Sequence, residues 1–185
     1  MTGVQTCALP ISAFAAALSA LPGFVACASA HPAPRAAAAP APDELGDGIE
    51  LYQQGKFAEA EAVLRRASGP EASAYLAGSL AKQRKYAEAE APAKAALEAN
   101  GTHEIAVAAL GASLVGQGKF DEAVQRLSAA LAARADLAYA YYWRAQAFQQ
   151  QRKADRMVAD YEAFLRLAPK APEAATVQQF LSTLQ

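Results

Sequence analysis

The sequence has few residues of the kinds that carry chemistry. Among 185 residues it contains two cysteines, Cys7 and Cys27, and two histidines, His31 and His103. Metal sites need grouped histidine, cysteine or carboxylate ligands at fixed spacing, and these scattered residues do not supply them. His31 lies in a proline-rich stretch, and we expect His103 to be a solvated residue in the first turn of a helix. We therefore predict no metal ion and no cofactor.

The charged residues show no excess of one sign. The chain has 17 lysines and arginines and 18 aspartates and glutamates, all of them after residue 34, and a net charge of -1. Nucleic acids and anionic membranes attract strongly basic surfaces, so we expect binding to neither. Gly118-Lys119-Phe120 lacks the serine or threonine of a phosphate-binding loop, and no G-x-S-x-G motif occurs. The sequence predicts a protein that is not an enzyme.

Residues 1–11, MTGVQTCALPI, resemble the in-frame translation of a short-read sequencing adapter. All of them are accounted for if the first codon is a GTG start. Such a scar is excluded from reasoning about the fold. We therefore expect that the native N-terminus is missing and that Cys7 has no role.

Residues 12–30 resemble the remainder of an export signal. The stretch has no charge, is dominated by Ala, Leu and Phe, and ends in Ala28-Ser29-Ala30, an A-x-A cleavage motif. A membrane anchor is the alternative, but Pro22-Gly23 interrupts the stretch, and a span needs roughly 20 apolar residues. Phe24-Val25-Ala26-Cys27 also resembles a bacterial lipoprotein box, which makes Cys27 a candidate lipidation site. Cleavage before Cys27 or after Ala30 would give an outer-membrane-anchored or a periplasmic protein.

Residues 31–42, HPAPRAAAAPAP, are a low-complexity segment of proline and alanine. A segment of this composition stays extended and cannot bury a core, so we expect a semi-rigid spacer. At about 3.1 Å per residue it would hold the rest of the chain roughly 35 Å from an anchor.

Four related phrases organise the remainder of the chain. They are Gly55-Lys56-Phe57-Ala58-Glu59-Ala60, Arg84-Lys85-Tyr86-Ala87-Glu88-Ala89, Gly118-Lys119-Phe120-Asp121-Glu122-Ala123 and the more divergent Arg152-Lys153-Ala154-Asp155-Arg156-Met157. The last three begin 34 residues apart, at 84, 118 and 152, and the first begins 29 residues before the second. Apolar residues around them recur at offsets of three and four, as in amphipathic helices. A 34-residue period with this pattern is typical of a helix–turn–helix repeat array.

These residues resemble tetratricopeptide repeats, from about Asp43 to Pro169. The resemblance implies an all-α fold, a right-handed α-solenoid of about four units at about 43–69, 70–103, 104–137 and 138–169. Within them we expect helix pairs at 43–54 and 57–67, 70–83 and 86–99, 103–117 and 120–133, and 137–151 and 154–167. In residues 170–185, a last helix from Pro172 to Leu184 should cap the apolar end of the array.

Three departures from the repeat predict an irregular array. The first unit is five residues short, because Ser68-Gly69-Pro70 ends its second helix early. Pro92 falls inside the predicted helix at 86–99, where an interior proline costs about 3 kcal/mol or forces a kink. The last unit has Ala154 and Met157 in place of the aromatic residue and the small alanine.

The resemblance also implies that the first helices of successive units line a concave groove. The residues expected to face it come from all four units: Ile49, Tyr52, Ala74, Gly78, Ala81, Lys82, Ile105, Ala108, Ala112, Val115, Tyr139, Tyr142, Gln146 and Gln149. They describe a nearly uncharged trough with an apolar centre and an end rich in aromatic and amide groups. For the alanines, packing between repeats is an equal alternative, and the last helix could instead fold back and fill the groove.

The resemblance implies a protein–protein interaction adaptor of the bacterial cell envelope. Its groove would take an apolar or amphipathic segment of a protein or peptide partner. The alternative is a structural, self-associating envelope lipoprotein whose repeats act as a spacer or an assembly scaffold. In both cases we expect membrane contact only through a lipid on Cys27.

Overall fold

The computed structural model describes residues 43–184. The predictions for the adapter-like segment, the export signal, Cys27 and the spacer fall on residues 1–42 and therefore lie outside the described residues.

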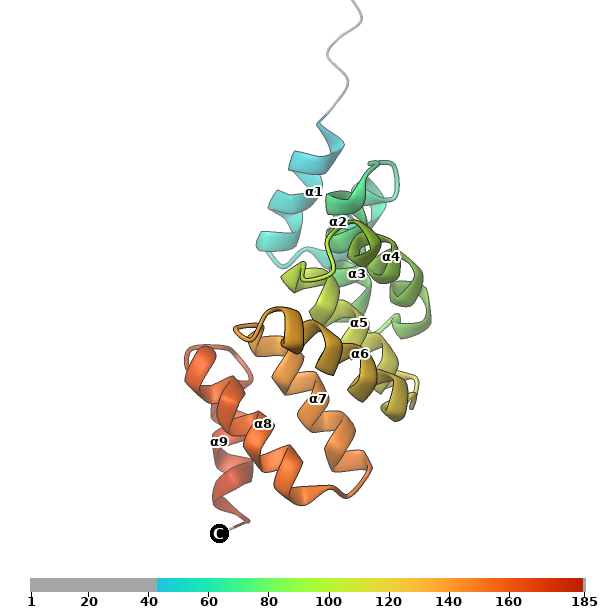
Figure 1. Ribbon diagram of the computed structural model, residues 1–185. Coiled ribbons are helices and arrows are strands. Elements are labelled where there is room, and N and C mark those ends of the chain that lie inside the picture. The colour runs from blue at the N-terminus through green and yellow to red at the C-terminus, as the bar shows by residue number, and fades with distance from the viewer. Residues whose placement is uncertain (1–42, 185) are drawn as a thin grey trace, which may run out of the picture. The chain divides into compact units, whose positions relative to one another are not determined.

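Residues 43–184 form nine α-helices and no strand (Figure 1). In chain order they are α1 (Glu44–Gln53), α2 (Phe57–Leu64), α3 (Pro70–Lys82), α4 (Tyr86–Ala99), α5 (Glu104–Gly116), α6 (Phe120–Ala133), α7 (Ala138–Gln150), α8 (Ala154–Leu167) and α9 (Ala174–Ser182). The all-α repeat solenoid is confirmed. Each helix lies within one residue of its predicted bounds except α2, which ends three residues early, and α9, which is two residues shorter at each end.

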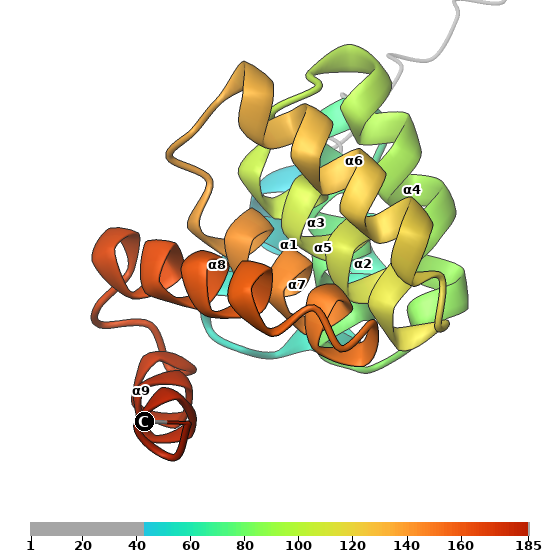
Figure 2. The same ribbon diagram turned by 60° about the horizontal axis from the view of Figure 1, so that its bottom comes forward.

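The helices pack as consecutive hairpins. The two helices of each unit contact each other, and the second helix of a unit contacts the first helix of the next. The first helices also form a row, in which α1 contacts α3, α3 contacts α5 and α5 contacts α7. The last helix, α9, packs on α8 and makes no comparable backbone contact with another helix among residues 43–184 (Figures 1 and 2). The row of first helices therefore ends at α7, and α9 does not continue it.

Small residues allow the helices to approach closely. Ala60, Ala89 and Ala123 of the repeated phrase are fully buried, and Met157 is buried at the same place in the last unit. At Gly111 an added Cβ would lie 2.8 Å from the Cβ of Trp143, so a side chain there would push α5 away from α7. Close packing of this kind leaves little room for a larger side chain.

The turn inside each unit has the same conformation in all four units of residues 43–184. Gly55, Arg84, Gly118 and Arg152 have φ of 76°, 62°, 75° and 58°, in the left-handed region. The lysine after each of them donates its N–H to the carbonyl five residues earlier, at 2.8–2.9 Å. This is the hydrogen bond of a helix-ending Schellman motif, which favours glycine at the left-handed position. Two units therefore carry an arginine where glycine is preferred.

Two carboxylates join successive units on the second helices. Glu61 accepts hydrogen bonds from Arg65 and, across the junction, from Gln83 at 2.8 Å and Lys85 at 2.7 Å. The Lys85 hydrogen bond is the main cause that lowers the pKa of Glu61 to about 2. In the next unit Glu90 repeats the arrangement and accepts from Lys94, Gln117 and Lys119 at 2.6–2.8 Å. The Lys119 hydrogen bond leads the causes that lower the pKa of Glu90, also to about 2.

A buried ion pair replaces this link near the C-terminal end. Arg144 of α7 donates two hydrogen bonds to the carboxylate of Asp160 on α8, both at 2.7 Å, and a third to Ser128 of α6 at 3.0 Å. Asp160 is 5% exposed. A bidentate arginine–carboxylate pair fixes geometry as well as energy, so it sets the relative positions of three helices.

His103 is not the solvated first-turn residue that the sequence suggested. It is the N-cap of α5, where its Nδ1 accepts the backbone N–H of Ala106 at 3.5 Å. Its Nε2 lies 3.2 Å from Oε2 of Glu71, and its side chain is mostly buried. The histidine side chain therefore satisfies a backbone donor that a helix start leaves free.

Candidate functional site

The first helices of the four units surround a cavity of about 230 Å³, here called the inner hollow. It is lined by Tyr52, Gly78, Ala81, Lys82, Glu104, Ile105, Ala108, Ala109, Ala112, Tyr139, Trp143 and Glu173, from α1, α3, α5, α7 and the N-cap of α9. Its wall is mostly alanine, isoleucine and aromatic carbon. Gly78 lets Ile105 and Tyr52 pack directly on α3, because an added Cβ there would lie 2.7 Å from Ile105 Cγ2 and 3.0 Å from Tyr52 Cε2.

Three polar side chains of the inner hollow, those of Lys82, Tyr139 and Glu173, lie together. The hydroxyl of Tyr139 donates to Oε2 of Glu173 at 2.8 Å, and Nζ of Lys82 lies 3.9 Å from Oε1 of the same carboxylate. The ammonium of Lys82 also lies 5.8 Å from the centre of the Tyr139 ring. Burial, and secondarily the hydrogen bond to Glu173, raise the pKa of Tyr139 well above its usual range. Its hydroxyl is therefore protonated and a donor at neutral pH.

A second cavity, here called the C-terminal hollow, lies between α7 and α9. It is lined by Tyr142, Gln146, Gln149, Tyr161, Pro172, Glu173, Thr176, Val177 and Phe180. Tyr142 of the C-terminal hollow packs against Tyr139 of the inner hollow, with ring centres 6.1 Å apart, and against Phe164, with ring centres 5.1 Å apart. Glu173 lines both hollows, so they are neighbours on one surface, which we call the groove.

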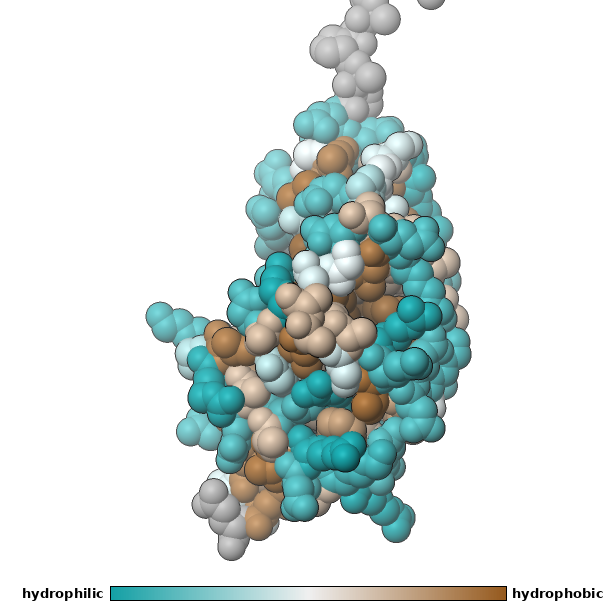
Figure 3. All heavy atoms as spheres, in the orientation of Figure 1, coloured by the Kyte–Doolittle hydropathy of each residue, from teal (hydrophilic) through white to brown (hydrophobic). Residues whose placement is uncertain are grey.

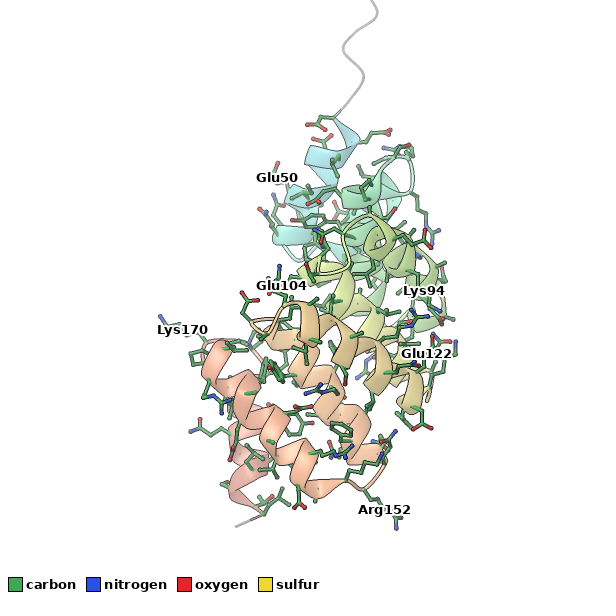
Figure 4. The ribbon with its side chains drawn as sticks, viewed as in Figure 1. Glu50, Lys94, Glu104, Glu122, Arg152 and Lys170 are labelled. Atoms are coloured by element: carbon green, nitrogen blue, oxygen red, sulfur yellow. The ribbon has the colours of Figure 1, made fainter. Side chains whose placement is uncertain are left out.

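The surface view shows how the apolar groups are distributed. On the face drawn in Figure 3, brown and tan side chains form the largest group near the middle of the array and a second group over α9, with teal side chains between them. In the view of Figure 4, Glu50, Glu104 and Lys170 lie on one side of the array and Lys94 and Glu122 on the other. Among residues 43–184, the charged residues that line the inner hollow are Lys82, Glu104 and Glu173.

Eleven of the fourteen residues predicted for the groove line one of the two hollows. Those in the inner hollow are Tyr52, Gly78, Ala81, Lys82, Ile105, Ala108, Ala112 and Tyr139. Those in the C-terminal hollow are Tyr142, Gln146 and Gln149. The predicted trough is thus divided in two by aromatic rings, and the last helix forms a wall of it without filling it.

Three predicted groove residues lie elsewhere. Ala74 is completely buried against Ala96 and Ala106, so it belongs to the core and a groove ligand could not reach it. Val115 is partly buried against the main core cluster, and Ile49 lines neither hollow. Ala74 packs against α4 of its own unit and α5 of the next, which is the packing between repeats that the sequence left open as the alternative for the alanines.

Four lining residues of the inner hollow were not predicted: Glu104, Ala109, Trp143 and Glu173. Trp143 could have been predicted, because it is a large aromatic residue that follows Tyr142 on the same helix. Glu173 lies outside the repeats in sequence, and only the path of the chain after α8 brings it to Lys82 and Tyr139. No repeat pattern predicts that contact.

Residues 43–184 contain no cluster of metal ligands and no helix suited to crossing a membrane. Among residues 43–184, no group of three or more histidine, cysteine, aspartate or glutamate side chains is placed to hold a metal ion. In the same part of the chain, no helix is both long and apolar enough to cross a membrane. What the groove offers chemically is apolar area, aromatic faces, tyrosine and threonine hydroxyls, two glutamine amides, the ammonium of Lys82 and the carboxylates of Glu104 and Glu173.

Comparisons with known proteins agree with this geometry. Residues 111–151 match the family model of the TPR repeat. A search of curated proteins found no match. Among solved structures, the chain is similar to YrrB, described as a TPR protein with an unusual peptide-binding site, with a TM-score of 0.59 and 17% identity over 74% of this chain and 73% of that one.

Structures of MamA are also similar. MamA 41-end from Desulfovibrio magneticus RS-1 has a TM-score of 0.56 and 18% identity over 76% of this chain and 93% of that one. MamA from MSR-1 has a TM-score of 0.55 and 17% identity over 75% of this chain and 85% of that one. At identities this low, the structural similarity establishes the fold alone. Residues 111–151 have the sequence pattern of the TPR repeat, and residues 43–184 have the fold of the TPR proteins among these structures.

Proposed function

We propose that this chain is a non-enzymatic protein–protein interaction adaptor that binds an apolar or amphipathic partner segment in the groove. The observation that carries the proposal is the inner hollow, an apolar cavity on the surface to which all four repeats contribute. Pockets lined mainly by apolar side chains with a few placed polar groups are typical binding sites. The peptide-binding site named for YrrB supports this use of the fold.

We further propose that the adaptor works in the bacterial cell envelope. The export-like segment at 12–30 and the lipoprotein-like sequence at Cys27 support this location. Radiolabelled palmitate incorporation that is lost in Cys27→Ser would establish the lipid anchor, whereas processing of both forms to the same size would favour cleavage after Ala30.

Affinity capture from envelope extracts tests the binding surface. The bait is residues 31–185, and the groove variant is Ala108→Arg, which places a long charged side chain in the inner hollow. Ala108 is chosen over Ala112 because Ala112 is only 4% exposed and an arginine there would disturb packing. The matched control is Ala132→Arg, at an exposed position of α6 outside both hollows.

We expect a partner that is retained by the parent and by Ala132→Arg and lost by Ala108→Arg, with thermal melting showing that both variants fold. Recovery of the same proteins by all three baits would rule out the groove as the working surface. Recovery of the chain itself as the main captured protein would instead support the self-associating alternative.

A further inference from the structure

We infer that the inner hollow receives the cationic side chain of a lysine or arginine in the partner segment, an inference that rests on the proposed adaptor function. The hollow combines aromatic rings with two carboxylates, those of Glu104 and Glu173, against the single cation Lys82. Aromatic faces and carboxylates together are the surroundings that stabilise an ammonium or guanidinium group.

Lys82 shows how such a cation is held. Its ammonium lies between the carboxylate of Glu173, at 3.9 Å, and the face of Tyr139, at 5.8 Å from the ring centre. The distance to the carboxylate is long for an ion pair, and the lysine side chain is 45% exposed. Ion pairs between exposed groups contribute little, so an incoming cation can displace Lys82 without a large loss.

The carboxylate of Glu173 is positioned to bind a cation that displaces Lys82. Its other carboxylate oxygen accepts the hydroxyl hydrogen of Tyr139 at 2.8 Å, which fixes the side chain at the boundary of the two hollows. A cation bound there would leave the neighbouring residues of the segment beside the apolar wall at Ile105 and Ala108, and beside Phe180 in the other hollow.

The charges of the lining residues disfavour an anionic ligand. A carboxylate entering the inner hollow would approach Glu104 and Glu173, and among the lining residues only Lys82 carries a positive charge. Glu104 also lies 3.6 Å from Arg134, which weakens but does not reverse this preference because the Glu104 side chain is largely exposed to solvent. The site therefore favours a partner segment in which a positively charged residue is flanked by apolar residues.

The test is selection of a random linear peptide library on the full chain, followed by binding titrations of enriched peptides. Each enriched peptide is compared with a copy whose basic residue is replaced by norleucine. The protein variants are Glu173→Gln, which can still accept the Tyr139 hydrogen, and Lys82→Met, which removes the resident cation. Glu162→Gln, at an exposed position of α8 outside the groove, is the matched control for loss of one negative charge.

We expect enriched peptides to carry lysine or arginine between apolar residues and to lose about tenfold in affinity on replacement by norleucine. Glu173→Gln should weaken binding similarly, Lys82→Met should strengthen it severalfold, and Glu162→Gln should leave it unchanged. Peptides that bind equally well as norleucine copies would overturn the charge preference and leave the adaptor proposal intact. Loss of binding in Lys82→Met would show an acidic ligand and overturn it too. Enrichment of no peptide would overturn both proposals.

Discussion

At the left-handed position of the turns, this array does not always carry glycine, the residue that the conformation favours. The left-handed position in the turn of each unit is glycine in two units and arginine in the other two. Sequence alone identified the repeated phrase, yet it could not show that Arg84 and Arg152 adopt the glycine conformation. The hydrogen bonds of the motif hold them there, because each following lysine donates to the carbonyl five residues back.

Replacing Arg152 by glycine should therefore stabilise the protein. A side chain in the left-handed region costs roughly 1–2 kcal/mol, part of which glycine loses again through its greater freedom in the unfolded chain. We expect Arg152→Gly to raise the free energy of unfolding by about 0.5–1 kcal/mol in denaturant titrations. Figure 4 shows Arg152 at the edge of the array, pointing away from the helices, so little packing is lost. Glu162→Gly, inside α8, is the control and should cost about 1 kcal/mol; a loss of stability in Arg152→Gly would contradict the explanation.

The lowered pKa values of the two junction glutamates, Glu61 and Glu90, predict that the protein loses stability in acid. Hydrogen bonds led by Lys85 and Lys119 lower the pKa values of Glu61 and Glu90 from 4.5 to about 2. A carboxyl whose pKa is lower in the folded state stabilises that state above its unfolded pKa and stops doing so as it becomes protonated. Stability should thus fall as pH drops from about 4.5 toward 2, and urea midpoints at a series of pH values would measure it. The double variant Glu61→Gln/Glu90→Gln should show a shallower fall; an equal slope in both proteins would place the acid sensitivity elsewhere.

At the scale of helices, local preference and tertiary packing conflict in α4. Pro92 lies in its interior, yet α4 runs from Tyr86 to Ala99. The proline has no N–H, so the carbonyl of Glu88 loses its helical partner. The buried alanines at 89, 93 and 96 hold this helix against its neighbours, and this packing overrides the break that the proline predicts.

We expect Pro92→Ala to raise the free energy of unfolding by about 1–3 kcal/mol, because it restores that hydrogen bond without adding volume. Pro70→Ala is the matched control. Pro70 is the first residue of α3, where a missing N–H costs nothing, so its replacement should be close to neutral. Equal effects of the two substitutions in thermal unfolding would mean that the interior position of Pro92 is not the cause.

Helix positions were predictable from this sequence, and side-chain surroundings were less so. Glycine, proline and the 34-residue period mark where helices begin and end, and these signals are local. The ends of α2 and α9 were placed less well, because no such signal follows Leu64 or Ser182 directly. The pair of Arg144 and Asp160 joins residues 16 apart on two helices, and periodicity does not say which polar residues turn inward.

For the array as a whole, the division of the groove depends on the last helix. The predicted residues of α3, α5 and α7 meet around one hollow because the repeats stack regularly. Glu173 closes that hollow because the chain after α8 brings α9 back beside α7 without packing on it. A repeat pattern contains no information on this step, so the carboxylate at the centre of the groove could not be predicted.

The last helix also covers the apolar end of the solenoid. Ala174 and Val177 are buried against the cluster that includes Tyr161 and Phe164, and the rings of Phe180 and Tyr161 lie 6.0 Å apart. A solenoid end without a cap exposes the face that would have bound the next repeat. Apolar surface of that kind promotes association between molecules.

Truncation after Ala168 should therefore lower the thermal midpoint and cause the chain to self-associate. Removing the buried residues of α9 is comparable to large truncations in a core, so we expect a loss of about 3–5 kcal/mol in the free energy of unfolding. Sedimentation velocity at increasing concentration would report the association. Leu184→Ser is the control, since Leu184 is 53% exposed and its replacement should change neither property. A truncated chain that stays monomeric and melts at the parent's temperature would show that α8 needs no cap, and the role of α9 would then be limited to placing Glu173 in the groove.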